Sequence, residues 1–364
     1  MFFTASPEEG KHHLQLSEHA MLCIASDREN FSPSGTPLPL AGFINRVFAN
    51  YFRLARASVA LQCAARLRER QVQREQYIAG HSLDGELPEQ LRRYDEALCR
   101  AEAQQQAQQI LRDLKQQKGR TLKVRINKEN MEYLYGSASR CAEESYYDGR
   151  AGLYLRAVLE EYCQLEYSQR ERIYFPLPSI QHGKTVLEIR PAYGRTALVY
   201  PYDVQAQALS PYNYLLGACF RQTEQGDGWQ PYLLRLSAVL ECREVPLPQN
   251  VPPPGEDLRR QCFAQARERG LSYLHFPCQQ VRVRLTKPEG VRLYRRILWY
   301  RPLMQAVESE DETGMICRFY CPPLQARAYF VRFGPEAQVL SPDDLRQDID
   351  RFFTDAAAQY HFQR

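Results

Sequence analysis

The pattern that most constrains this chain is a strand followed by two helices, which occurs twice about 110 residues apart. In the first copy, Leu14 and Leu16 alternate with polar residues and predict a short strand with one buried face. Ser17 then predicts the N-cap of a helix that runs to about Asn30. Further on, apolar residues return at helical spacing and predict a second helix with one apolar face: Leu40, Phe43, Ile44, Val47, Phe48 and Tyr51.

The second copy begins near residue 120. Alternating apolar residues again predict a strand, Asn127 takes the cap position, and we expect a helix to about Tyr146. The helix after it carries apolar residues that match those of the first copy: Leu155, Val158, Leu159 and Tyr162. One such unit cannot bury its apolar faces alone. We therefore expect the strands at 14–16 and 124–126 to pair within one chain, as a pseudo-dimer, and a large separation would contradict this.

This order of elements resembles the ribbon-helix-helix family, and Leu40-Ala41-Gly42-Phe43-Ile44-Asn45-Arg46 is similar to the opening of that family's second helix. The resemblance implies that outward strand residues enter a nucleic-acid groove, and the candidates are Lys11, His13, Gln15, Lys123 and Arg125. Gln pairs well with adenine, and Arg or Lys with guanine. The alternative is that these side chains are the solvated face of the ribbon. A ribbon built from two unlike copies would not favour a palindromic site.

Between the copies, the chain is long, polar and rich in Ala, Gln, Arg and Glu. The segment from Gly80 to Pro88 interrupts it and predicts a helical hairpin over 57–119. Cations make its first arm basic: Arg53, Arg56, Arg66, Arg68, Arg70 and Arg74. This arm is either a solvated helix face or a flank for nucleic acid, and the sequence leaves both readings open.

Short apolar strands rich in aromatic and branched residues fill 169–247, which suits a small bent sheet or barrel. We expect strands at 173–175, 185–190, 196–200, 214–220 and 232–240, with a turn at Gly226-Asp227-Gly228. The stretch resembles the WYL domain, an SH3/Sm-like β-barrel of bacterial regulators, and Asn213-Tyr214-Leu215 stands at the naming tripeptide.

The WYL resemblance implies a basic pocket for nucleotides or nucleic acid. The candidate residues for this pocket are Arg190, Arg195, Tyr214, Arg221 and Arg235. Tyr214 and Arg235 stand at matched motif positions. The alternative reading places Tyr214 in the core of the barrel and Arg235 on its exposed rim.

A proline-rich linker and a helix over 256–269 lead to an α/β region at 278–364. We expect strands at 281–285, 315–321 and 329–333, and a helix over 290–308. Val339-Leu340-Ser341-Pro342, with Leu345-Arg346, resembles the C-terminal extension that follows many WYL domains. A cluster here has Glu289 as its only acidic residue and fits single-stranded nucleic acid or a dimer surface: Arg282, Arg284, Lys287, Arg292, Arg295, Arg296, Trp299 and Arg301.

The composition sets further limits on function. The 364 residues are 44% hydrophobic and 25% charged, which is ordinary for a globular protein. We see no membrane span or signal peptide and expect a cytoplasmic protein. The 11 cysteines lack a Cys-x-x-Cys pair, so we expect free thiols and no metal. Gly183-Lys184-Thr185 is not preceded by the first glycine that a phosphate-binding loop requires. We therefore expect no nucleotide cofactor at this motif, and we expect the protein to be neither cofactor-dependent nor an enzyme.

The whole arrangement resembles the WYL accessory proteins encoded beside the RNA-guided ribonuclease of type VI-D CRISPR systems. The resemblance implies a homodimer formed through the C-terminal region, binding of single-stranded RNA, and stimulation of the ribonuclease. The alternative is a DNA-binding transcription regulator with a ligand-sensing WYL domain. We predict an α+β chain with domains at 1–56, 57–119, 120–168, 169–247, 248–277 and 278–364.

Overall fold

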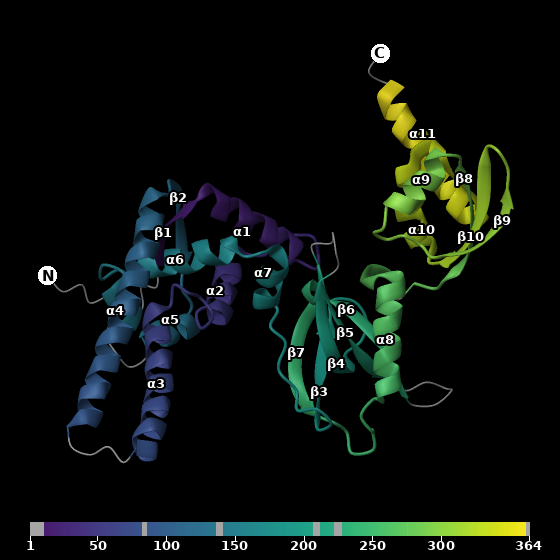
Figure 1. Ribbon diagram of the computed structural model, residues 1–364. Helices are drawn as coiled ribbons and strands as arrows, with labels where there is room; N and C mark the ends of the chain where they lie inside the picture. The colour runs from purple at the N-terminus through teal and green to yellow at the C-terminus, as the bar shows by residue number, and fades with distance from the viewer. Residues whose placement is uncertain are drawn as a thin grey trace. The chain divides into compact units, whose positions relative to one another are not determined.

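The computed structural model describes residues 11–81, 86–135, 141–206, 212–221, 228–274 and 276–361. The chain divides into two compact units, Met1–Leu177 with Leu236–Ala238, and Pro178–Arg235 with Val239–Arg364. Helices and antiparallel sheets occur in both units, so the predicted α+β class is confirmed (Figure 1). Among the described helices, none has the length and hydrophobicity needed to cross a bilayer.

The N-terminal unit is built on a two-stranded ribbon. Strand β1 (Lys11–Ser17) pairs antiparallel with β2 (Gly119–Arg125), and Lys11 lies opposite Arg125. Leu14, Leu16 and Val124 face the core and are almost fully buried. The predicted pairing of the two copies within one chain is therefore confirmed.

The first copy has the helices that its sequence predicts. Helix α1 (Glu18–Asn30) starts at Ser17, whose Oγ accepts a hydrogen bond from the Ala20 amide at 3.1 Å. Helix α2 (Leu40–Tyr51) buries its predicted apolar face. In the second copy, Asn127 Oδ1 caps α5 (Lys128–Tyr135) by accepting from the Asn130 amide at 3.0 Å.

The prediction that the first helix of the second copy extends to about Tyr146 is wrong. Helix α5 ends at Tyr135, residues 136–140 are outside the described residues, and η2 (Ala142–Tyr146) is a 3₁₀ turn. Helix α6 (Ala151–Gln164) then supplies the matching apolar face. The predicted strand at 173–175 is also wrong, because Tyr174 ends helix α7 (Tyr167–Tyr174) and stacks on Phe43 with ring centroids 4.9 Å apart.

Helices α3 (Val59–His81) and α4 (Leu87–Gln116) form the predicted hairpin and run side by side (Figure 1). Ion pairs join them along their length: Arg66 lies 3.0 Å from Glu102, and Arg74 lies 2.7 Å from Asp95. The basic first arm therefore has acidic partners on the second arm, and much of its charge is compensated.

In the second unit, β3 (Thr185–Pro191), β4 (Ala197–Ala206), β5 (Asn213–Arg221), β6 (Gly228–Arg235) and β7 (Val239–Pro246) form one antiparallel sheet in the order β6-β5-β4-β3-β7. Among the described residues no ladder joins β6 to β7, so the strands form an open five-stranded sheet where the WYL resemblance implies an SH3/Sm-like barrel. The strand predicted at 232–240 is two strands separated by η3 (Leu236–Ala238). Of the predicted turn, residues 226–227 lie outside the described residues.

Helix α8 (Glu256–Arg269) packs on one face of this sheet through Cys262 and Ala266. A second sheet has the order β11-β8-β10-β9, formed by β8 (Gln279–Thr286), β9 (Met304–Glu310), β10 (Gly314–Cys321) and β11 (Ala337–Ser341). The 3₁₀ turn η4 (Leu271–Tyr273) precedes this sheet, and its Leu271 belongs to the core that α8 forms on the first sheet. The helical elements of the second sheet are α9 (Glu289–Arg296), α10 (Pro323–Phe330), η5 (Val331–Glu336) and α11 (Asp343–His361).

Two predictions for this region are wrong. The strand predicted at 329–333 is helical, since it spans the end of α10 and the start of η5. The helix predicted over 290–308 is α9 followed by strand β9, because the chain turns at Trp299-Tyr300 and Pro302 removes a helical donor. Tyr329 and Phe330 are buried against Phe319 of the sheet, which explains their apolar character.

Candidate nucleic-acid interface

The ribbon presents all its predicted contact residues on one exposed face. Because strand residues alternate, Lys11, His13 and Gln15 point away from the core that Leu14 and Leu16 enter. The register places Lys11 opposite Arg125 and His13 opposite Lys123. All of these polar side chains are exposed. The structure therefore gathers the predicted ribbon residues into one surface, which we call the ribbon face: Lys11, His13, Gln15, Lys123 and Arg125.

The cations of the ribbon face are uncompensated. None of Lys11, Lys123 and Arg125 forms an ion pair with a carboxylate in the part of the chain that the structure describes. His12, between Lys11 and His13, faces the other way, and burial lowers its pKa. The ribbon face is thus a patch of like charge, and such a patch attracts polyanions.

Buried polar side chains fix both ends of the ribbon. At one end, the Glu160 carboxylate accepts from the Ser17 amide at 2.6 Å and the Ser17 hydroxyl at 2.7 Å. At the other end, Asn45 Oδ1 accepts from the Asn127 amide at 2.8 Å, and Asn45 Nδ2 donates to the Arg125 carbonyl at 2.9 Å. Sequence reasoning missed these anchors, and the available signal was a polar Asn45 inside the apolar stripe of α2.

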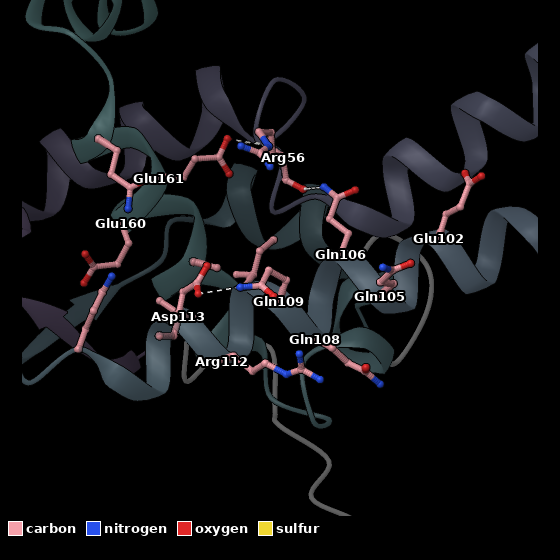
Figure 2. A pocket seen from close by; sticks show the side chains of 15 residues that line it. Arg56, Glu102, Gln105, Gln106, Gln108, Gln109, Arg112, Asp113, Glu160 and Glu161 are labelled. Carbon is pink, nitrogen blue, oxygen red and sulfur yellow. Dashed lines mark hydrogen bonds between the residues drawn. The ribbon is translucent and has the colours of Figure 1, made fainter.

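A polar groove of about 560 Å³ runs between α4 and α6 and includes Arg56 (Figure 2). Its Glu161 carboxylate accepts from Tyr51 Oη at 2.9 Å, the Arg56 amide at 2.7 Å and the Ala57 amide at 2.9 Å. Burial, and then the nearby carboxylate, raise the pKa of Tyr51. The carboxylates of Glu160 and Glu161 thus accept hydrogen bonds from the first copy and from the residues after it, and they connect the two copies. Because these carboxylates already have donors within the protein, we assign no ligand to the groove.

The structure does not bring the predicted WYL pocket residues together. Tyr214 and Arg235 are opposite each other on β5 and β6, and Tyr214 Oη lies 3.1 Å from Ser272 Oγ. Arg190 is on β3, beyond β4, and forms an ion pair with Glu241.

The two remaining predicted pocket residues lie elsewhere on the same sheet. Arg195 is exposed between β3 and β4, and Arg221 is exposed at the far end of β5 from Tyr214. The guanidinium of Arg235 lies over the ring of Tyr212, 3.8 Å from its centroid. These cations are therefore spread over the sheet and do not line one pocket.

The C-terminal cation cluster is divided by the structure. Strand β9 and the turn after it bring carboxylates to its first members: Glu308 lies 2.7 Å from Arg282, and Glu310 lies 2.6 Å from Lys287. The pKa of Asp311, which lies 4.0 Å from Arg284, is lowered chiefly by a hydrogen bond from Thr313.

Other members of the cluster have different surroundings. Arg292 forms an ion pair with Glu289 at 2.5 Å. Arg295 and Arg296 are exposed and have no carboxylate partner within the described ranges. Trp299 is 42% exposed, and Arg332 lies over its ring, 3.8 Å from the centroid. Sequence reasoning missed Arg332 because it is far from Trp299 along the chain.

One stretch of the chain matches a family model, that of the WCX domain. The family model of that domain matches residues 278–355, and this confirms the C-terminal extension that the sequence predicts. No curated protein matches the chain at a significant level. The C-terminal cation cluster and the whole of strands β8 to β11 lie inside this matched region, which we call the WCX domain.

Two solved structures match the chain, and the first of them supports its architecture. One is described as "Crystal structure of a CRISPR Cas-related protein", with a TM-score of 0.68, 18% identity, and coverage of 97% of this chain and 94% of that chain. Another, the proteasome accessory factor B/C (PafBC) of Arthrobacter aurescens, has a TM-score of 0.29, 17% identity, and coverage of 66% of this chain and 37% of that chain. The first shows that the fold extends over the whole chain, WCX domain included, and the second carries no structural weight.

Proposed function

We propose that this protein is a non-catalytic accessory protein that binds single-stranded RNA and stimulates a type VI CRISPR RNA-guided ribonuclease in the cytoplasm. The observation that carries the proposal is the ribbon face, where exposed cations stand opposite one another and have no carboxylate partner among the residues that the structure describes. Support comes from the likeness in fold, over 97% of the chain, to a structure described as a CRISPR Cas-related protein. The proposal includes a homodimer formed through the C-terminal region and requires no cofactor.

The proposed mechanism is electrostatic. Lys11, Lys123 and Arg125 contact successive phosphates of a flexible strand, and their mutual repulsion falls when the polyanion binds. Bound RNA is then held near the ribonuclease at a raised local concentration. No bond is made or broken by this protein.

The test compares single-stranded RNA, single-stranded DNA and duplex DNA at one salt concentration, because salt alone changes such affinities by orders of magnitude. The variant carries Lys11→Glu, Lys123→Glu and Arg125→Glu. A matched control reverses the same amount of charge on the hairpin with Arg68→Glu, Arg93→Glu and Arg100→Glu. We expect the ribbon variant, and not the control, to bind RNA about a hundredfold more weakly and to stimulate RNA cleavage by the ribonuclease less.

One observation favours a second candidate, a DNA-binding transcription regulator. A two-stranded antiparallel ribbon is narrow enough to enter the major groove of duplex DNA, and Gln15 and Arg125 could read base edges there. Tighter binding to duplex DNA than to single-stranded RNA in the same assay would favour the regulator and contradict the accessory function.

A further inference from the structure

The WCX domain carries a second exposed surface, formed by the end of α9, the α9–β9 connection and η5. We call it the Trp299 surface, and its members are Arg295, Arg296, Leu298, Trp299, Arg301, Leu303 and Arg332. Leu298 is 65% exposed, Leu303 is 64% exposed and Trp299 is 42% exposed. Apolar side chains this exposed on adjoining positions mark an interaction site.

The connection is held so that Trp299 stays at the surface. Tyr300 has φ of +59°, a left-handed conformation that is strained for a residue with a side chain. Its carbonyl accepts from Gln325 Nε2 at 3.2 Å, and the Ile297 carbonyl accepts from Tyr329 Oη at 2.8 Å. Both Gln325 and Tyr329 are buried, so the connection is fixed on each side of Leu298 and Trp299.

The charged side chains that form the Trp299 surface are all arginines. Arg332 lies 3.8 Å from the centroid of the Trp299 ring, and Arg301 lies 5.4 Å from the centroid of Tyr294. Within the described ranges, no carboxylate forms an ion pair with Arg295, Arg296, Arg301 or Arg332. Guanidinium groups beside an exposed indole are the combination that single-stranded nucleic acids use, because phosphates take the cations and bases stack on the ring.

Other occupants fit this surface less well. A second copy of the chain would bring the same cations against these cations, and like charges oppose such a contact. A nucleic-acid duplex hides its base faces in the stack, so it would leave Trp299 without a partner.

We propose that the Trp299 surface is an RNA subsite separate from the ribbon face, where one unstacked base packs on Trp299 and neighbouring phosphates contact Arg295 and Arg296. This inference rests on the proposed function, because it requires that the protein binds single-stranded RNA. It adds a stacking contact to a purely electrostatic one.

The chain has 2 tryptophans, and this allows a direct test. In a Trp229→Phe protein, Trp299 is the only indole, and its fluorescence reports on its own surroundings. We expect an oligouridine strand to quench this fluorescence, whereas an abasic phosphodiester strand of the same length binds without quenching it. Trp299→Leu should lower the affinity for oligouridine by about tenfold, the usual contribution of one stacked base. The matched control Tyr193→Leu removes an exposed aromatic residue from the connection between β3 and β4 and should leave the affinity unchanged.

The outcomes separate this subsite from the proposed function. If the parent protein binds no single-stranded RNA, both fail. If RNA binds and the ribbon variant loses that binding, but Trp299 is not quenched and Trp299→Leu has no effect, only the subsite is overturned. Equal quenching by the abasic strand also overturns it, because that result reports charge and not stacking. A loss of dimer mass in light scattering for Trp299→Leu, with RNA affinity unchanged, would assign the surface to a second copy instead.

Discussion

Two sheets of this molecule carry alternating cations in their sequences, but only one of them has carboxylates beside those cations. On the ribbon, Lys11 stands opposite Arg125, and on the WCX sheet, Arg282 stands opposite Arg318. The WCX sheet has a further strand, β9, whose Glu308 lies 2.7 Å from Arg282 and 3.9 Å from Arg318. Within the described residues, the ribbon has two strands, and no neighbouring strand brings a carboxylate to it.

The difference shows that alternation of cations does not by itself identify a binding surface. Like charges directly opposite each other on adjacent strands are destabilising. The WCX sheet relieves this repulsion internally through Glu308, whereas the ribbon keeps it. A surface that keeps such repulsion gains the most when a polyanion binds, and this is why we place the main phosphate contacts on the ribbon.

The largest expected effect comes from reversing charge on each sheet in turn. Lys11→Glu, Lys123→Glu and Arg125→Glu together should weaken binding of single-stranded RNA by about a hundredfold or more at moderate salt, because phosphate contacts dominate affinity. Reversing Arg282, Arg284 and Arg292 should weaken it by less than about fivefold, because these cations already have acidic partners. Fluorescence anisotropy with a labelled strand measures both, and equal losses would break the comparison.

The ribbon depends on buried polar anchors more than the WCX sheet does. Asn45→Ala removes the acceptor of the Asn127 amide and the donor to the Arg125 carbonyl, and it should destabilise the N-terminal unit by about 3 kcal/mol. Gln325→Ala removes the hydrogen bond to the Tyr300 carbonyl in the WCX domain and should destabilise it by about 1 kcal/mol. Hydrogen exchange of the β1 and β2 amides should rise only in the first variant. No change in ribbon protection for Asn45→Ala would contradict the role of Asn45.

A substitution of Glu308 should make the WCX sheet resemble the ribbon. Glu308→Gln keeps the shape of the side chain but releases Arg282 and Arg318 from their shared acid. We expect RNA affinity to rise about threefold, because a partly exposed pair is worth little and each freed cation adds one weak phosphate contact. Glu241→Gln, which releases Arg190 on the other sheet, is the matched control for charge. A rise of the same size in both variants would show a general charge effect and no local one.

The smallest expected effect concerns pH, and it applies to the ribbon. The pKa of His12 is lowered in the folded protein by burial, so protonation favours the unfolded chain. The contribution of His12 to stability is therefore complete above its unfolded pKa of about 6.5 and is lost as the pH falls below that value. Thermal unfolding at pH 7.5 and pH 5.5 should show a larger drop for the parent than for His12→Asn. Equal decreases in the unfolding temperature of the two proteins would show that His12 does not cause the loss of stability at low pH.

Local patterns in the sequence predict the elements well where capping and periodicity agree. Ser17 and the apolar stripe of α2 give α1 and α2 their observed ends, and the repeated pattern gives the pairing of β1 with β2. The prediction fails where a continuous apolar run contains a turn whose residues are buried by tertiary packing. Leu236 and Ser237 are buried, so the 3₁₀ turn between β6 and β7 reads like a continuous strand.

The sequence predicts which residues belong to the candidate site, but it does not predict which of their charges are neutralised by a neighbour. Lys11 and Arg125 were predictable because strand alternation is local. The neutralisation of Arg282 by Glu308 and the packing of Arg332 on Trp299 each join positions more than a strand apart, so no local pattern reveals them. The same holds for Asn45, whose role depends on Asn127 in the other copy.

The salt dependence of RNA binding tests the central claim most directly. Each neutralised phosphate on a single strand contributes about 0.7 to the slope of log K against log salt. If Lys11, Lys123 and Arg125 each contact a phosphate, the charge-reversed ribbon variant should have a slope smaller in magnitude by about 2 than the parent and the hairpin control. An unchanged slope in the ribbon variant would contradict the account, because it would place the phosphate contacts elsewhere on the protein.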